Sequence, residues 1–231
     1  MIIGITGGIG SGKSTIAKEL SRRGFAVYDC DREAKRIIAE NPAVQQQIIA
    51  LFGEEAFVDG EYNTAYISKC VFSPPLGGAG GGLQALNAII HPAVKEDIIK
   101  QARLASFGDA VASFHHSAER PLFIESAILY EAGLDALCDR IIIVDAPEDI
   151  RIARTIARDY HGEATPENIN KVRARIRAQQ HPLPGAGGPY SPSRGSRRGS
   201  CGAGGSLILL NDGSASISDL ADTILHWLQK S

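Results

Sequence analysis

The chain has 231 residues, of which 44% are hydrophobic and 22% charged, and its formal net charge at pH 7 is −2. This length and composition are typical of one soluble α/β domain with an added lobe or lid, and the near-zero charge excludes a global field that attracts nucleic acid or an anionic membrane. Because the sequence shows no membrane-length apolar run, no signal peptide and no CxxC pair, we expect a reduced, cytoplasmic protein without a structural zinc.

The predicted elements begin with a short, β-branched strand over residues 1–6, which glycines interrupt and follow as in a buried parallel strand. Apolar residues at helical spacing predict a helix over residues 14–23, with Gly24 as its C-cap. Residues 25–29 predict a second strand, and a polar helix follows until Asn41-Pro42 stops it. Together these elements predict a βαβ unit.

Three later apolar runs predict strands, and the segments between and after them predict helices. The predicted strands are Leu122–Glu125, Arg140–Asp145 and 207–210, and the predicted helices are 84–105, 147–160 and Ile217–Gln229. Since strands that alternate with helices form parallel sheets, we expect an α/β fold with helices on both faces of the sheet.

The distribution of predicted strands indicates how the chain is divided into a core and a lobe. The middle region, about 41–106, is mostly helical and is the candidate for an inserted substrate lobe. The expected core comprises about 1–40, 107–150 and 207–231. Two Gly/Pro/Ser-rich runs, 74–82 and 181–206, bury too little apolar surface to offset chain entropy, so we expect flexible insertions there.

The stretch GGIGSGKST fulfils the phosphate-loop pattern Gly-x-x-x-x-Gly-Lys-Ser at residues 7–14, after a predicted strand and at the start of a predicted helix. Its glycines let backbone N–H groups surround a β-phosphate at a helix N-terminus. Lys13 then reaches the β- and γ-phosphates, and the Ser14 hydroxyl binds Mg²⁺. The full pattern in this context favours a phosphate site over a glycine-rich turn that binds nothing and predicts ATP and Mg²⁺ as cofactors, but it does not identify the phosphoryl acceptor.

Two carboxylates, Asp29 and Asp31, come at the end of the second predicted strand, where open α/β sheets bind their ligands. Residues i and i+2 of an extended chain project to the same face, so both could face the phosphate loop. A carboxylate there can accept or orient the proton of an attacking hydroxyl. Alternatively, Asp31 caps the helix that starts at Arg32, and it could do both.

Three arginines, Arg151, Arg154 and Arg158, fall on one stripe of a predicted helix. In this place they could clamp phosphates or stack on an adenine ring. Their spacing alone favours another interpretation, a solvated helix face with Glu148 and Asp149 as partners.

Several motifs occur in an order that resembles the dephospho-coenzyme A kinase family. They are TGGIGSGKS, DCD after the second strand, FGEEAF, LNAIIHP, ILYEAG, VDAPEDIRIARTIARD, RARIRAQQ and LLNDGS. Many kinases share the phosphate loop, whereas the double glycine before it, the DxD and the LNxxxHP are much more specific. The resemblance covers about 1–73, 83–106, 122–180 and 207–230.

The resemblance implies a phosphate-loop kinase fold with a helical coenzyme A lobe, a lid over about 151–180, and phosphorylation of the ribose 3′-hydroxyl of dephospho-CoA by ATP. The implied catalytic residues are Asp31, which activates this hydroxyl, and Lys13. The implied ATP contacts are Gly8, Gly10, Ser11, Gly12, Lys13, Ser14, Thr15, Arg154, Arg158, Asn211 and Gly213. The implied substrate contacts are Asp29, Asn87 and His91, although a lone histidine before proline is more often structural.

Glu125 and Glu131 match acidic positions of the family around the central strand, and Glu125 could support Mg²⁺ through water. Three positions depart from the family: residues 62–64 lack its arginine, Ala127 replaces a proline, and Arg151 replaces a glutamine. Two other functions stay open, another phosphate-loop kinase of small metabolites or nucleosides, and a nucleotide-binding relative with impaired turnover. The expected partners are small molecules, with neither nucleic acid nor membrane, and the oligomeric state is not predicted.

Overall fold

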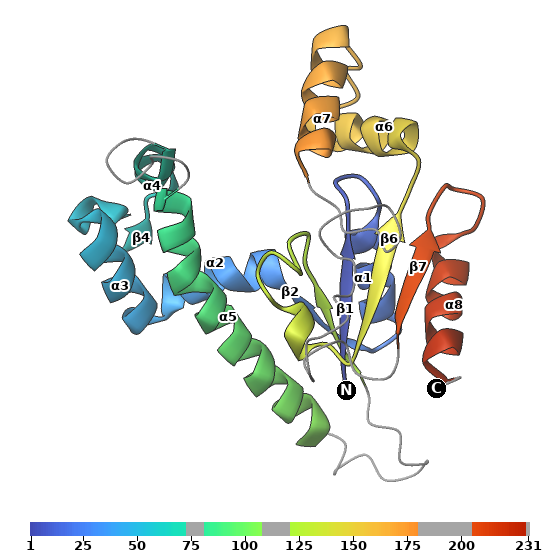
Figure 1. Cartoon of the computed structure of the whole chain (residues 1–231), viewed down its shortest axis with the longest axis horizontal. Helices are drawn as coiled ribbons and strands as arrows, with labels where there is room; N and C mark the ends of the chain where they lie inside the picture. The colour runs from blue at the N-terminus through green and yellow to red at the C-terminus, as the bar shows by residue number, and fades with distance from the viewer. Residues whose placement is uncertain (73–80, 108–120, 180–204, 230–231) are drawn as a thin grey trace, which may run out of the picture. The chain divides into compact units, whose positions relative to one another are not determined.

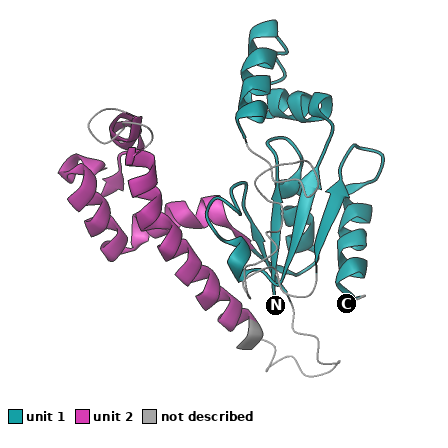
Figure 2. Cartoon of the chain, viewed as in Figure 1, with its two compact units in different colours: residues 1–27, 108–231 teal, residues 28–107 magenta. Residues whose placement is uncertain are grey.

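The computed structural model describes residues 1–72, 81–107, 121–179 and 205–229. Contacts divide the chain into two units (Figure 2), one of residues 1–27 and 108–231 and one of Tyr28–Phe107. The division falls inside the second strand, so the helical unit begins before the expected lobe boundary at about 41. The assignment of substrate-lobe and lid roles to these segments stays a prediction.

A parallel sheet has the strand order β2-β5-β1-β6-β7 (Figure 1). Its strands are β1 (Ile2–Gly7), β2 (Ala26–Asp29), β5 (Leu122–Glu125), β6 (Arg140–Asp145) and β7 (Ser206–Leu210). The first unit contains all of these strands except β2, which the division crosses. Its helices are α1 (Lys13–Arg22), α6 (Glu148–Asp159), α7 (Pro166–Ala178) and α8 (Ile217–Gln229), with a short 3-10 helix η4 (Asp135–Leu137). The predicted parallel α/β sheet is therefore confirmed.

The two faces of this sheet pack against different elements. Ile3 and Ile5 of β1 project to one face and are buried with apolar side chains of α1 and α8. Phe25 and Phe123 meet edge to face on this side, with ring centroids 5.6 Å apart. On the opposite face, Gly4 lies against side chains of the segment that follows β5, where a Cβ would be 2.9 Å from Leu129 Cδ2 and from Cys138 Sγ.

Helix α1 ends just before Gly24, as the sequence predicts. Gly24 has a φ of 88°, and its N–H donates to the Ser21 carbonyl, while Phe25 N–H donates to the Leu20 carbonyl. This reversal sends the chain directly into β2, which keeps α1 antiparallel to the strands that it covers.

The start of α2 (Cys30–Glu40) differs from the sequence analysis. The helix begins at Cys30, and the Asp29 carboxylate caps it by accepting the Arg32 N–H at 3.0 Å. The alternative that Asp31 caps this helix is therefore wrong. Because Asp31 lies in the first helical turn, the argument from extended i and i+2 side chains does not hold for it. The predicted stop at Asn41-Pro42 is confirmed, and Asn41 caps the next helix.

The second unit is built around one long helix, α5 (Gly81–Phe107), which packs against α2, α3 (Pro42–Phe52) and α4 (Thr64–Phe72). After the 3-10 helix η1 (Glu54–Ala56), two strands absent from the prediction, β3 (Phe57–Val58) and β4 (Glu61–Tyr62), form a hairpin. Each has two residues, too few for an alternating pattern. Asp59 and Gly60 between them both have positive φ, as a tight hairpin turn requires.

The expected flexible insertions fall mainly outside the described residues. Of 74–82 the structure describes residues 81 and 82, which begin α5, and of 181–206 it describes residues 205 and 206, with Ser206 in β7. The other residues of both runs are not described. Among the described helices, none combines the length and the apolar character that spanning a bilayer requires.

Candidate nucleotide site

The loop between β1 and α1 presents unpaired backbone donors. Ser11 N–H donates to the Gly8 carbonyl at 3.0 Å, and the Thr15 and Ile16 N–H groups share the Gly12 carbonyl at 3.1 Å. Within the described part of the chain, no protein acceptor is found for four further loop N–H groups, those of Gly10, Gly12, Lys13 and Ser14. Such a set at a helix N-terminus is suited to bind an anion.

Two glycines make this loop shape possible. Gly10 and Gly12 have φ of 76° and 96°, in the left-handed region. A Cβ on Gly10 would lie 2.4 Å from the Arg151 carbonyl oxygen, and one on Gly12 would lie 2.2 Å from Asn211 Nδ2. Both positions therefore require glycine for conformation and for space.

The donors open into a cavity of about 440 Å³. It is lined by Gly10, Gly12, Lys13, Ser14, Thr15, Lys18, Arg154, Thr155, Arg158, Asn211 and Ile217. These residues come from the phosphate loop and α1, from α6, and from the segment between β7 and the start of α8. Four of them are basic and none is acidic, so a chain with a net charge of −2 has a locally positive site here.

A carboxylate at the end of β5 contacts the two functional side chains of the loop. Glu125 Oε1 accepts a hydrogen bond from Ser14 Oγ at 3.1 Å and lies 3.8 Å from Lys13 Nζ. Glu125 is buried, and β5 is the neighbour of β1 in the sheet. The sequence suggested that Glu125 could support Mg²⁺ through water, and its contact with the proposed Mg²⁺ ligand Ser14 is consistent with that role.

Two of the three arginines on α6 contact the phosphate loop. Arg151 Nε donates to the Ile9 carbonyl at 2.9 Å, and Arg154 Nη1 donates to the Ser11 carbonyl at 3.3 Å. Arg154 also donates to the carbonyl and side-chain oxygens of Asn211, at 3.0 and 3.2 Å. The interpretation of these two arginines as a solvated face paired with acidic residues of the first turn is therefore wrong.

Arg158, the third arginine, is exposed and pairs with its neighbour Asp159 at 2.6 Å. Arg175 of α7 donates to the same carboxylate at 2.8 Å. Hydrogen bonds from these two arginines lower the pKa of Asp159 to about 2, and the bond with Asp159 raises the pKa of Arg158. The carboxylate therefore connects α6 to α7 beside the cavity.

The cavity contains three residues that the sequence analysis did not identify, Lys18, Thr155 and Ile217. A signal existed for Lys18, which lies one helical turn after Ser14 and so on the same face of α1. Three predicted ATP contacts are not among its lining residues, namely Gly8, Ser11 and Gly213. Gly8 and Ser11 shape the loop through their carbonyl groups, and Gly213 has a φ of 87° in the turn after β7.

The predicted substrate residues belong to the helical unit. Asp31 is exposed in the first turn of α2, where the helix dipole favours a negative charge. Asn87 and His91 are half-buried one turn apart on α5 and therefore lie on the same face of this helix. Burial, and then the neighbouring Lys95, lower the pKa of His91, so its imidazole is neutral at pH 7.

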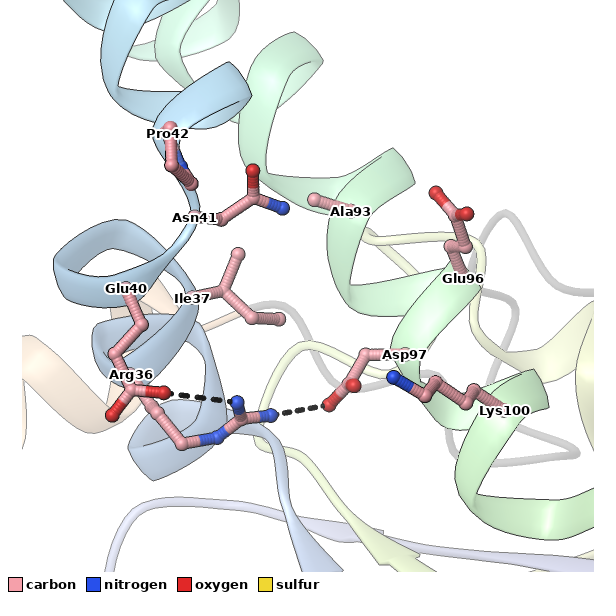
Figure 3. A pocket seen from close by; sticks show the side chains of 9 residues that line it. All are labelled: Arg36, Ile37, Glu40, Asn41, Pro42, Ala93, Glu96, Asp97 and Lys100. Atoms are coloured by element: carbon pink, nitrogen blue, oxygen red, sulfur yellow. Dashed lines mark hydrogen bonds and ion pairs between the residues drawn. The ribbon is translucent and has the colours of Figure 1, made fainter. Parts of the chain in front are cut away.

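A second cavity, of about 350 Å³, lies within the helical unit between α2, the start of α3 and α5 (Figure 3). Arg36 of α2 reaches across it to Asp97 of α5 at 2.7 Å, and Tyr28 also donates to Asp97 at 2.9 Å. Burial and the bond to Asp97 raise the pKa of Tyr28 above its ordinary value. These contacts fix α2, with Asp31 in its first turn, against the helix that carries Asn87 and His91.

Within the described residues, no group of three or more His, Cys, Asp or Glu side chains could hold a metal ion. The hydroxyl of Ser14 and the carboxylate of Glu125 are nevertheless hard oxygen donors in contact with each other. Mg²⁺ usually keeps several waters and binds few protein ligands together with substrate phosphates, and this pair fits such a site.

A family model described as dephospho-CoA kinase matches residues 1–182. The dephospho-CoA kinase of Porphyromonas gingivalis is 41% identical over 178 residues, which cover 77% of this chain and 77% of that protein. A solved structure from Thermus thermophilus has a TM-score of 0.64 and 29% identity, and the match covers 100% of this chain and 97% of that one. The dephospho-CoA kinase of Campylobacter jejuni has a TM-score of 0.56 at 16% identity, over 99% of this chain and 97% of that one. These matches confirm the predicted phosphate-loop kinase fold.

Proposed function

The chain belongs to the dephospho-CoA kinase family, and from this premise we propose that it transfers the γ-phosphoryl group of ATP to the ribose 3′-hydroxyl of dephospho-CoA. The products are coenzyme A and ADP, so the reaction is the last step of coenzyme A synthesis. The observation that carries the nucleotide half of this proposal is the set of unpaired loop N–H groups beside Lys13 in a positively charged cavity.

The loop residues bind the phosphates of ATP. The free N–H groups of Gly10, Gly12, Lys13 and Ser14 donate to the β-phosphate, and the Lys13 ammonium contacts the β- and γ-oxygens. Arg158, whose pairing with Asp159 raises its pKa and keeps it charged, faces the same cavity. These charges stabilise the negative charge that develops on the bridging oxygen as the γ-phosphoryl group leaves.

The metal side of the site rests on Ser14 and Glu125. The Ser14 hydroxyl would bind Mg²⁺ directly, and Glu125 would hold that hydroxyl and accept hydrogen bonds from metal-bound water. When bound, Mg²⁺ neutralises charge on the β- and γ-phosphate oxygens. Glu125 also attracts the Lys13 ammonium, which keeps this flexible side chain near the cavity while no phosphate is bound.

On the acceptor side, Asp31 is the base. The oxygen of the 3′-hydroxyl attacks the γ-phosphorus, the bond from this phosphorus to the β,γ-bridging oxygen breaks, and the hydroxyl proton passes to the Asp31 carboxylate. Asp29 contributes by capping α2, which fixes the turn that carries Asp31. Asn87 and neutral His91 supply hydrogen-bonding groups for the acceptor from α5.

Product analysis after incubation with Mg·ATP and dephospho-CoA tests this function. We expect one phosphate on the ribose 3′-oxygen and an equal amount of ADP. Asp31→Asn should lower kcat by about 10²- to 10⁴-fold, because an amide cannot act as the general base. The dissociation constant for ADP should stay unchanged. Asp149→Asn, at an exposed carboxylate on α6, is the matched control and should keep wild-type turnover.

Two results would contradict the proposal. Strong stimulation of ADP release by another alcohol, such as a nucleoside or a sugar acid, with none by dephospho-CoA, would assign the chain to a different substrate. Near-normal kcat in Asp31→Asn would remove the base assignment while leaving the kinase activity intact.

A further inference from the structure

One arginine lies behind the phosphate loop and does not line its cavity. Arg151 is 9% exposed, and its Nε donates to the Ile9 carbonyl at 2.9 Å. Two other arginines of α6, Arg154 and Arg158, line the cavity, whereas Arg151 is not among the described lining residues. Its guanidinium therefore contacts the loop backbone and does not line the cavity.

This contact determines where the next amide points. In a planar trans peptide the C=O and N–H bonds are antiparallel, so a donor that fixes the Ile9 carbonyl also directs the Gly10 N–H away from Arg151. Gly10 N–H is one of the donors without a protein acceptor. Arg151 thus holds a phosphate-binding N–H in place without touching the phosphate.

A similar arrangement recurs two peptides further along the loop, at the Ser11 carbonyl. Asn211 Nδ2 and Arg154 Nη1 donate to the Ser11 carbonyl at 2.8 and 3.3 Å, which directs the Gly12 N–H in the same manner. Gln179, which follows α7, accepts the Ile9 N–H at 2.8 Å. Side chains of the proposed lid segment and of the turn after β7 therefore hold the loop backbone at Ile9 and at Ser11.

The charge of Arg151 adds to this effect. Within the described residues it pairs with no carboxylate, and its Nη2 is buried without a hydrogen-bond partner. An uncompensated buried cation is unfavourable in the free protein. A polyphosphate bound in the loop would supply negative charge, so its binding would relieve part of this cost.

From these contacts we infer that Arg151 is a positioning residue, which holds the Ile9–Gly10 peptide so that the loop is shaped for the β-phosphate before nucleotide binds. This inference rests on the ATP site of the proposed function. It assigns a role to an arginine at a position where the resemblance leads us to expect a glutamine.

The test compares equilibrium binding of ATP, ADP and AMP, because AMP lacks the β-phosphate that the loop binds. In Arg151→Met we expect ATP and ADP to bind at least about tenfold more weakly, because the variant loses a hydrogen bond from a charged donor. The affinity for AMP should change by less than about twofold. Arg151→Gln keeps an N–H donor for the Ile9 carbonyl and should recover part of the loss. Arg173→Met, at a half-buried arginine of α7 paired with Glu148, is the matched control and should bind all three nucleotides normally.

Unchanged ATP and ADP affinities in Arg151→Met would overturn the inference. Equal weakening of ATP, ADP and AMP would also overturn it, because the residue would then support the site as a whole. If Arg151→Met fails to fold, the same comparison in Arg151→Gln and Arg151→Lys decides, and a loss confined to ATP and ADP supports the inference. A wild-type chain that binds ATP but ignores dephospho-CoA would contradict the proposed acceptor only, while one that binds no ATP would contradict both proposals.

Discussion

At the phosphate loop, the hydroxyl of Ser14 has a fixed partner before any metal binds. Glu125 receives its hydrogen bond at 3.1 Å and stands 3.8 Å from the Lys13 ammonium, in a largely buried position. One carboxylate therefore orients both the proposed metal ligand and the proposed phosphate ligand, and its charge is available to water on a bound cation.

Replacing Glu125 by glutamine should weaken the response to Mg²⁺. We expect the free Mg²⁺ concentration for half-maximal turnover to rise about 10- to 100-fold, as for other lost supporting groups of metal sites, because the amide keeps the shape but not the charge. Turnover measured at saturating ATP over a series of free Mg²⁺ concentrations checks this. Glu163→Gln, at an exposed glutamate, is the control, and identical Mg²⁺ dependence in the two variants would show that Glu125 does not support the metal.

Individual residues differ in how well the sequence predicts them. Lys13 and Ser14 follow from the motif, because the chemistry of the loop fixes their positions. The contacts of Arg151 and Gln179 with the loop could not be predicted, because their partners are backbone groups of Ile9 that lie 142 and 170 positions away along the chain. A backbone carbonyl leaves no trace in the sequence as a hydrogen-bond acceptor.

At the scale of elements, an ion-paired junction connects α1 to α8 on the covered face of the sheet. Arg23 donates to the Ser218 carbonyl at 2.8 Å and to Asp222, both of α8, and to Glu19 of α1 at 2.9 Å. Hydrogen bonds from Arg22 and Arg23 lower the pKa of Glu19 from 4.5 to about 2. This junction holds together the two helices that bury the inner side of β1.

The lowered pKa of Glu19 predicts a pH dependence of stability. The unfolded chain binds a proton at Glu19 near its ordinary pKa of 4.5, whereas the folded chain does so only near 2, so this contribution is present above about pH 4.5 and is lost as the pH falls toward 2. In Glu19→Gln we expect a lower melting temperature at pH 7 and a flatter dependence between these pH values. Thermal unfolding from pH 2 to 7 checks it, with Glu61→Gln at an exposed residue of β4 as the control. A wild-type slope in Glu19→Gln would contradict the assignment.

Most helices and strands could be predicted, because a buried face requires apolar residues at a regular spacing in the sequence. β5, β6 and α8 have the bounds expected from their apolar runs. The hairpin of β3 and β4 was not predicted, since two-residue strands show no alternation, although the Asp59-Gly60 turn was a usable signal. The predicted start of α2 was wrong because Asp29 and Asp31 can each cap a helix, and the sequence does not show which of them does so.

For the molecule as a whole, the described cavity for nucleotide draws its lining from the first unit alone. Binding there should therefore stabilise the folded chain by mass action. At an ADP concentration about 100 times its dissociation constant the gain is about 2.7 kcal/mol, which corresponds to a rise in melting temperature of roughly 5 to 11 °C for a chain of this size.

Lys13→Ala should abolish most of this rise, because it removes a charge that contacts the phosphates, and should change the melting temperature without nucleotide only slightly. Thermal unfolding with and without ADP measures both quantities. Lys171→Ala, at an exposed lysine paired with Glu167, should retain the full rise. An equal rise in Lys13→Ala and wild type would show that ADP binds elsewhere.

The hydrogen bond from Asn211 to the Ser11 carbonyl joins residues 200 positions apart, so the phosphate loop receives a supporting contact from a segment that follows much later in the chain. During translation, β1 and α1 leave the ribosome long before that partner is made. A nascent or prematurely terminated chain that lacks the segment around Asn211 carries the whole glycine-rich motif, but without one of the contacts that give it a shape ready for ATP. The ability to bind the nucleotide should accordingly arise only after the segment around Asn211 has emerged.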